Sequence, residues 1–178
     1  MVPGIIRALA FTLAASAASC SARQLGFPRT QVSATSPDDN HVALIRNHAD
    51  IDPPSQSIWV GRRAGTTRLI KRLGPDSDWC NTIVWSPDSS TVAFLIQDAH
   101  LVTVDAATQN VISDKWLTPW RGEYPPDQVA VDLTLDARGT EARFRVCDRG
   151  MWRDYFVFDA TNCGDFRKVA LREPTPDP

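Results

Sequence analysis

Short apolar and β-branched runs alternate with polar turn residues along most of the chain from residue 31 onward. Runs of this kind, bounded by Pro, Asp, Asn and Gly, predict β-strands joined by tight turns. The pattern also repeats. Residues 32–45 align without gaps onto residues 82–95, and residues 130–144 form a weaker third copy. We therefore expect one structural unit to occur three times.

The spacing of the copies indicates the size of that unit. Ser36 and Ser86 are 50 residues apart, and Ser86 and Thr134 are 48 residues apart. A period of this length suits one blade of a β-propeller or a comparable four-stranded sheet. In each copy we expect a strand, a tight turn and a second strand, because Pro presets a turn and Asp accepts hydrogen bonds from nearby backbone N–H groups.

Each copy continues into a predicted third and fourth strand joined by a turn. The expected pairs are 57–61 and 67–72 with a turn at Gly65, 101–105 and 111–116 with a turn at 106–110, and 154–158 and 166–171 with a turn through Asn162 and Gly164. The result is twelve strands and almost no helix. We therefore predict an all-β domain over residues 31–178, made of three four-stranded antiparallel blade-like sheets, with repeats at about 31–73, 81–117 and 129–171.

The second copy carries a family resemblance. Its sequence from Trp85 to Phe94, WSPDSSTVAF, closely resembles the WD40-like (TolB-type) β-propeller repeat, and Asp105 and Asp159 match a later aspartate of that pattern. In the third copy, Leu135 stands in place of the proline. Propellers close with four to eight blades, so three repeats imply an incomplete propeller-like fold. Two chains completing one ring as a homodimer, or a collapsed sandwich, are the alternatives.

The N-terminus resembles an export signal. Arg7 precedes an apolar run from Ala8 to Ala18, which is the layout of a signal peptide over residues 1–19. Ala17-Ala18-Ser19-Cys20 resembles a bacterial lipobox, so Cys20 is the expected lipidation site, followed by a polar tether to residue 30. The alternative is ordinary cleavage after Ala17. These features predict a periplasm-facing location in the cell envelope, and Ser21 favours the outer membrane.

Composition narrows the possible partners. The chain has 19 basic and 21 acidic side chains, a net charge of -2 and a pI near 5.9. Such a balance creates no basic field for phosphate backbones, so we expect no nucleic-acid partner. No stretch reaches the roughly 18 apolar residues of a membrane-spanning helix. With no Gly-rich phosphate loop, we expect no cofactor.

Four cysteines bear on the exported state. If Cys20 carries lipid, three remain, and Cys147 and Cys163 are the preferred disulfide because they are 16 residues apart on predicted neighbouring segments. Cys80 would then be a buried thiol. The alternative is that all three simply fill small apolar sites.

The sequence contains no recognisable catalytic constellation. It lacks G-x-S-x-G, and His41, His48 and His100 have no metal-ligand spacing, so we expect no metal. His41 falls in a predicted strand, and the other two fall in predicted loops. The acidic clusters at residues 38–40 and 76–78 are expected to form turns. We therefore predict a protein that is not an enzyme. A small carboxylate-dependent hydrolase using Asp76, Asp78 and Glu123 is the less favoured alternative.

The connector between the second and third copies is the best candidate for recognition. It contains Trp116, Trp120, Arg121 and Tyr124 among prolines. Trp, Tyr and Arg dominate binding energy at interfaces, although the Trp rings could instead plug the gap between sheets. We therefore expect a non-catalytic envelope lipoprotein that docks a protein or peptide. A periplasmic immunity or inhibitor lipoprotein is a specialised variant.

Overall fold

The computed structural model describes residues 32–48, 55–74, 79–96, 99–118, 128–149 and 160–172, and every regular element in these ranges is a β-strand. The strands are β1 (Val32–Thr35), β2 (His41–His48), β3 (Ser55–Arg62), β4 (Thr67–Leu73), β5 (Cys80–Trp85), β6 (Thr91–Ile96), β7 (His100–Asp105), β8 (Val111–Trp116), β9 (Gln128–Leu135), β10 (Glu141–Arg149) and β11 (Ala160–Ala170). The predicted leader and tether lie outside the described residues.

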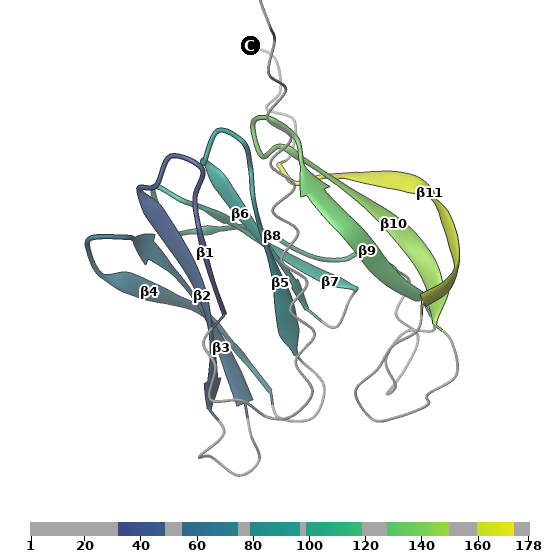
Figure 1. Cartoon of the computed structure of the whole chain (residues 1–178), viewed down its shortest axis with the longest axis horizontal. Helices are drawn as coiled ribbons and strands as arrows, with labels where there is room; N and C mark the ends of the chain where they lie inside the picture. Colours follow the sequence, from purple (N-terminus) through teal and green to yellow (C-terminus); the bar gives the residue numbers. More distant parts are fainter. Residues whose placement is uncertain are drawn as a thin grey trace, which may run out of the picture.

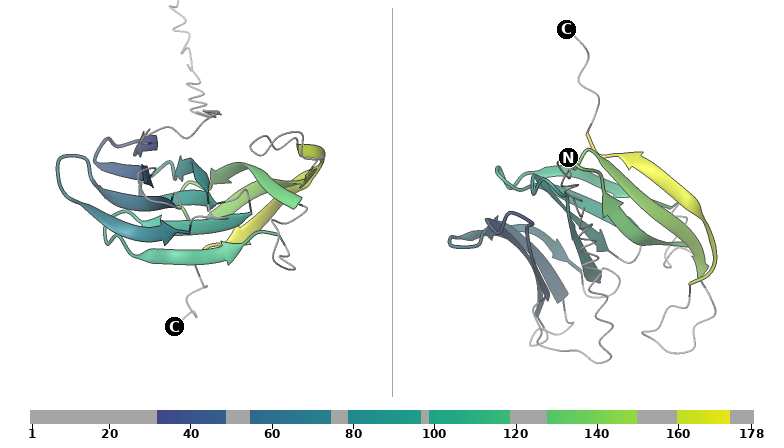
Figure 2. Two further views of the ribbon diagram at one scale, coloured as in Figure 1. Left: turned by 90° about the horizontal axis from the view of Figure 1, so that it is seen from below. Right: turned by 45° about the horizontal axis from the view of Figure 1, so that its top comes forward.

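The strands form three antiparallel sheets that stand side by side in chain order (Figure 1). The first sheet has the order β1-β2-β3-β4, the middle sheet β5-β6-β7-β8, and the last sheet β9-β10-β11. The right-hand view in Figure 2 also shows the three sheets side by side, and none of them closes on itself. The all-β, incomplete propeller-like fold predicted from the repeats is confirmed.

The middle sheet is buried on both faces. On β6, the side chains of Val92, Phe94 and Ile96 pack against the first sheet. Those of Ala93 and Leu95 pack against the last sheet. Successive strand residues point to opposite faces, so a strand between two sheets must be apolar at every position rather than at alternate ones. This explains why residues 91–96 show no polar alternation.

Two hydrophobic cores result from this arrangement. The first lies between the first and middle sheets and contains Ala43, Ile45, Ile58, Val60, Leu73, Cys80, Val92, Phe94, Ile96, Val102 and Val104. The second lies between the middle and last sheets and contains Ala93, Leu95, Leu101, Ala130, Leu133, Leu135, Ala142, Phe144, Val146 and Leu171. The first strand of each sheet also contacts that of the next: β1 meets β5, and β5 meets β9. The Trp85 indole N–H on β5 donates to the Ala34 carbonyl oxygen on β1, at 3.2 Å.

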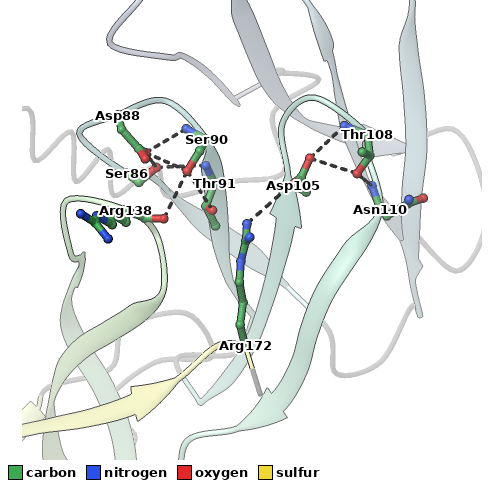
Figure 3. Close-up of polar contacts among 9 residues, drawn as sticks. All are labelled: Ser86, Asp88, Ser90, Thr91, Asp105, Thr108, Asn110, Arg138 and Arg172. Atoms are coloured by element: carbon green, nitrogen blue, oxygen red, sulfur yellow. Dashed lines mark hydrogen bonds and ion pairs between the residues drawn. The ribbon is translucent and has the colours of Figure 1, made fainter. Parts of the chain in front are cut away.

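The Ser-Pro-Asp turns hold themselves together through side chains, as Figure 3 shows for the second copy. The Ser86 hydroxyl donates to the Asp88 carboxylate (2.7 Å) and accepts from the Thr91 N–H (3.0 Å). The same carboxylate accepts from the Ser90 N–H (3.0 Å). Ser89 has a left-handed backbone, with φ of 64°. The turn at residues 36–41 repeats these bonds.

The third turn begins at Asp136, which corrects the predicted register. Its N–H donates to the Glu141 carbonyl oxygen (3.0 Å), as the Ser86 N–H does to that of Thr91 (2.8 Å). The equivalent residues are therefore Ser86 and Asp136, 50 apart, and the predicted spacing of 48 is wrong. Ala137, rather than Leu135, occupies the place of the proline.

A single carboxylate replaces the Ser-Asp pair in this turn. Oδ1 of Asp136 accepts from the N–H groups of Thr140 (2.6 Å) and Glu141 (2.7 Å), and Oδ2 accepts from the Thr140 hydroxyl (2.9 Å). Because the carboxylate has moved from the third position of the turn to the first, matching the Ser-Pro-Asp pattern placed the third copy two residues early.

The last sheet differs from prediction in its outer strand. β11 is continuous through residues 162–164, so the predicted turn through Asn162 and Gly164 is wrong. Two register shifts between β10 and β11 absorb the extra residues as irregularities instead. The predicted strand at 166–171 falls almost entirely within β11, whereas the predicted strand at 154–158 lies outside the described residues. The described part of this sheet therefore has three strands.

Cysteine chemistry ties β10 to β11. Cys147 and Cys163 lie opposite each other in register and form a disulfide. This is the pair that the sequence favours, although Cys163 lies in a strand and not in the predicted turn. Cys80 is buried at the start of β5, and its thiol donates to the Thr82 carbonyl oxygen at 3.7 Å.

We predict that Gly139→Ala destabilises the protein by about 2 kcal/mol. Gly139 has a φ of 63°, and an added Cβ would overlap the side chain of Thr91 on the middle sheet. Urea unfolding with the disulfide intact measures the change. Gly164→Ala is the control, since its Cβ would make an ordinary 3.6 Å contact with the Val146 carbonyl oxygen. Equal stability of the two variants would contradict this role for the third turn.

Candidate functional site

Of the four residues proposed for recognition, the structure describes Trp116, the last residue of β8. Trp120, Arg121 and Tyr124 lie outside the described residues. The same is true of Cys20 and of the carboxylates at positions 76, 78 and 123 that would form the alternative hydrolase site. The geometry of the candidate site is therefore built outward from Trp116.

The Trp116 ring lies against a histidine at the outer edge of the middle sheet. His100, the first residue of β7, is opposite Trp116 in register. The two rings stack with centroids 4.6 Å apart and an angle of 15° between their planes. His100 is 9% exposed, whereas Trp116 is 43% exposed. The indole is thus supported from one side and accessible from another, rather than enclosed as a plug.

A charged side chain orients the histidine. Asp114 on β8 is bonded through Oδ1 to Nε2 of His100. Its other oxygen, Oδ2, accepts from the Lys71 ammonium at 2.8 Å. Lys71 lies on β4, so this chain of contacts also connects the edges of the first and middle sheets. Partial burial alone would raise the pKa of Asp114, but the bonds from Lys71 and His100 outweigh it and hold the pKa below its ordinary value.

This arrangement suits binding by contact. A Trp ring offers a large apolar area and one N–H donor, and its binding entropy cost falls when the ring is already held in place. His100 stacks on the ring, Asp114 is bonded to His100, and Lys71 places a cation on Asp114. The corner formed by Trp116, His100, Asp114 and Lys71 is called the Trp116 corner below.

Sequence reasoning missed three members of this corner. His100 was predicted in a loop, which is wrong because it begins β7; His48, also predicted in a loop, ends β2. The predicted hairpin of 101–105 with 111–116 did contain a usable signal. Extending it by one residue places His100 opposite Trp116. The contribution of Lys71 depends on packing between two sheets, which no local pattern reveals.

Three other carboxylates of the repeats, those of Asp38, Asp88 and Asp136, accept hydrogen bonds within the turns. Hydrogen bonds from Ser36 and Asn40 hold the pKa of Asp38 far below its ordinary value. At Asp88 and Asp136, burial disfavours the charged carboxylate and by itself would raise the pKa. Hydrogen bonds within each turn outweigh it and lower both pKa values. In the described ranges, no three His, Cys, Asp or Glu side chains are grouped to hold a metal ion.

Within the same ranges, no helix combines the length and apolar content needed to span a bilayer.

Comparison with known proteins gives matches to solved structures alone. No family model matches the sequence, and no curated protein sequence matches it. Similar solved structures include an oligogalacturonate lyase in complex with manganese, at 14% identity and a TM-score of 0.46, covering 70% of this chain and 38% of that one. Acylaminoacyl peptidase from Pyrococcus horikoshii has 14% identity and a TM-score of 0.41, covering 69% and 18%.

A third similar structure is KlHsv2 with loop 6CD replaced by a Gly-Ser linker. It has 14% identity and a TM-score of 0.40, covering 78% of this chain and 44% of that one. The chain therefore spans less than half the length of each of these three proteins.

We predict that Asp114→Ala lowers stability by about 1 kcal/mol at pH 7, the scale of a partly exposed charged contact. Because the pKa of Asp114 is lowered in the folded state, its contribution is present above the unfolded pKa near 4 and is lost as pH falls through the folded pKa. The difference between wild type and variant should therefore shrink between pH 5 and pH 2. Urea unfolding across this range measures it.

Lys71→Met is the matched control for this experiment, because it removes only the more exposed partner of Asp114. We expect it to change stability by less than about 0.5 kcal/mol. A difference for Asp114→Ala that is absent at pH 7, or unchanged at low pH, would show that Asp114 does not stabilise the corner through its charge.

Proposed function

We propose that this protein is a non-catalytic docking module of the bacterial cell envelope, which binds an envelope protein or peptide. The binding surface consists of the Trp116 corner together with Trp120, Arg121 and Tyr124 of the adjoining connector. Recognition residues commonly project from the loops and edges of a rigid scaffold. The paired cores and the disulfide provide such a scaffold here.

One observation carries this proposal. Trp116 is 43% exposed, yet its ring is stacked on a largely buried histidine. An exposed Trp that is held in one orientation is what a binding site requires, because ordering the ring on binding then costs little. Its position also matters, since the connector that contains the other two aromatic residues and Arg121 begins immediately after β8.

The proposed location rests on the sequence of the N-terminus. Cys20, preceded by small residues, would carry the lipid, and the tether would let the β domain face the periplasm from the outer membrane. A docking module attached in this way would sample partners within reach of the membrane surface, at an effective concentration set by the tether. Binding of this kind needs no cofactor.

Site-specific crosslinking tests the docking surface. The exported full chain is produced with p-benzoylphenylalanine at position 116 and irradiated in intact cells. We expect one dominant crosslinked envelope protein. The control carries the same group at Val111, which is 48% exposed at the other end of β8. It should give no such product, since it lies on the same strand but away from the corner.

Two results would count against the proposal. The first is an identical crosslinking pattern from positions 116 and 111, which would indicate non-specific collision. The second is no product from either position. The mass of the N-terminal peptide from the same cells tests the anchor. A lipidated chain gives a peptide that begins at Cys20 and carries the added mass of the lipid, whereas cleavage elsewhere gives an unmodified peptide that begins at another residue.

A further inference from the structure

The three repeats differ at the positions that face the next sheet. On β2, Ala43 and Ile45 pack against the middle sheet. On β6, the equivalent Ala93 and Leu95 pack against the last sheet. The structural period of 50 residues places Arg143 and Arg145 at these positions on β10. The face that is apolar and covered on two sheets is therefore cationic and exposed on the third.

Two residues of β11 complete this surface. Phe166 lies opposite Arg145 in register, and Lys168 lies opposite Arg143. Directly opposed residues share a face, so all four side chains project outward from the last sheet. We call this surface, defined by Arg143, Arg145, Phe166 and Lys168, the cationic face. Its side chains are accessible: Phe166 is 47% exposed as a residue, and the Lys168 side chain is 57% exposed.

The arginines surround an apolar centre. The guanidinium carbon of Arg145 lies 4.7 Å from the centroid of the Phe166 ring, and that of Arg143 lies 5.9 Å from it. Cations at these distances interact favourably with the ring. The stacking orders the guanidinium groups before any ligand arrives, as the disulfide between the same two strands orders the backbone.

The charge on this face is only partly compensated. Asp132 lies 3.7 Å from Arg145, and Glu141 lies 3.1 Å from Lys168, each measured between nitrogen and oxygen atoms. Within the described part of the chain, Arg143 has no carboxylate partner. Three cations thus stand against two carboxylates, with positive charge concentrated beside Phe166.

A second copy of the chain is a poor occupant of this face. A two-chain ring would bring the cationic face against the outward face of the first sheet. Ala43 and Ile45 point to the middle sheet, so Arg46 on the same strand points outward, and its guanidinium carbon lies 4.6 Å from the Trp59 ring centroid. Closure would therefore oppose arginine to arginine, which costs free energy at an interface.

We propose that the cationic face is a second docking surface, which binds an extended acidic polypeptide segment. Carboxylates of the segment pair with Arg143 and Arg145, whose planar guanidinium groups suit bidentate contacts with carboxylate oxygens. An apolar side chain between those carboxylates covers Phe166. Asp132 and Glu141 at the borders would repel a continuous anionic surface, and for this reason we favour a peptide over a membrane.

Peptide titration tests this surface independently of the Trp116 corner, which is formed by the first and middle sheets. The full exported chain, extracted in neutral detergent, is titrated with a fluorescent ten-residue peptide of alternating Glu and Val, and with its Lys-Val counterpart. We expect the acidic peptide to bind at least about tenfold more tightly, with affinity falling as salt is added. Arg143→Ala and Phe166→Ala should each weaken binding by about fivefold to tenfold.

Arg72→Ala is the matched control, since Arg72 is also an exposed strand arginine but lies on β4 of the first sheet. It should change the affinity by less than about twofold. The proposal is overturned if both peptides bind equally, if Arg72→Ala weakens binding as much as Arg143→Ala, or if the chain binds phosphatidylglycerol vesicles but not the acidic peptide. Urea unfolding of each variant verifies that the last sheet remains folded.

Discussion

Burial of the middle sheet on both faces is the constraint on which the rest of the molecule depends. Neither outer sheet has a second apolar layer among the described residues, and each packs its one core face against the middle sheet. Phe94 illustrates the effect, since it is fully buried toward the first sheet while its neighbours Ala93 and Leu95 are buried toward the last. Burying one side chain of this size contributes roughly 2 to 3 kcal/mol. The three sheets therefore stabilise one another through the middle sheet, where β6 contributes five residues and β7 contributes three to the two cores.

The ends of the array follow from the same principle. A sheet that faces no neighbour has no use for apolar residues on its outer face, and terminal repeats of stacked proteins generally carry polar ones there. Arg143 and Arg145 occupy positions that hold Ala, Ile or Leu in the first two repeats. These arginines leave a charged outer surface on the last sheet, and this is the surface that we propose as a docking site.

Much of this fold could be predicted from the sequence, because strand and turn signals are local. The Ser-Pro-Asp turns and the apolar runs after them located the first eight strands closely. The register of the third turn was predicted less well, because a different residue supplies the hydrogen-bonding carboxylate there. Asp136 performs with one carboxylate what Ser86 and Asp88 do together, and a sequence pattern does not show such an exchange. The turn predicted through Asn162 and Gly164 was wrong for a related reason. These turn-forming residues lie within the edge strand β11, which accommodates extra residues through register shifts.

The candidate sites show where sequence reasoning stops. Trp116 could be singled out by composition alone, since exposed Trp beside Arg and Pro is typical of interfaces. The contacts of Trp116 with His100, and of His100 with Asp114, could be predicted only once β7 was paired with β8. The hydrogen bond from Lys71 to Asp114 could be predicted only once the first and middle sheets were placed together. The cationic face needed the corrected 50-residue register, because the predicted spacing of 48 did not align Arg143 with Ala93.

Native-state hydrogen exchange tests most directly whether the three sheets form one cooperative unit. The account predicts that amides of Phe94 on β6 and Phe144 on β10 exchange only through global unfolding, with opening free energies within about 1 kcal/mol of each other. Their dependence on added urea should also be the same. If Phe144 exchanged with a much smaller free energy while Phe94 stayed protected, the last sheet would open independently, and the central role given to the doubly buried middle sheet would be wrong.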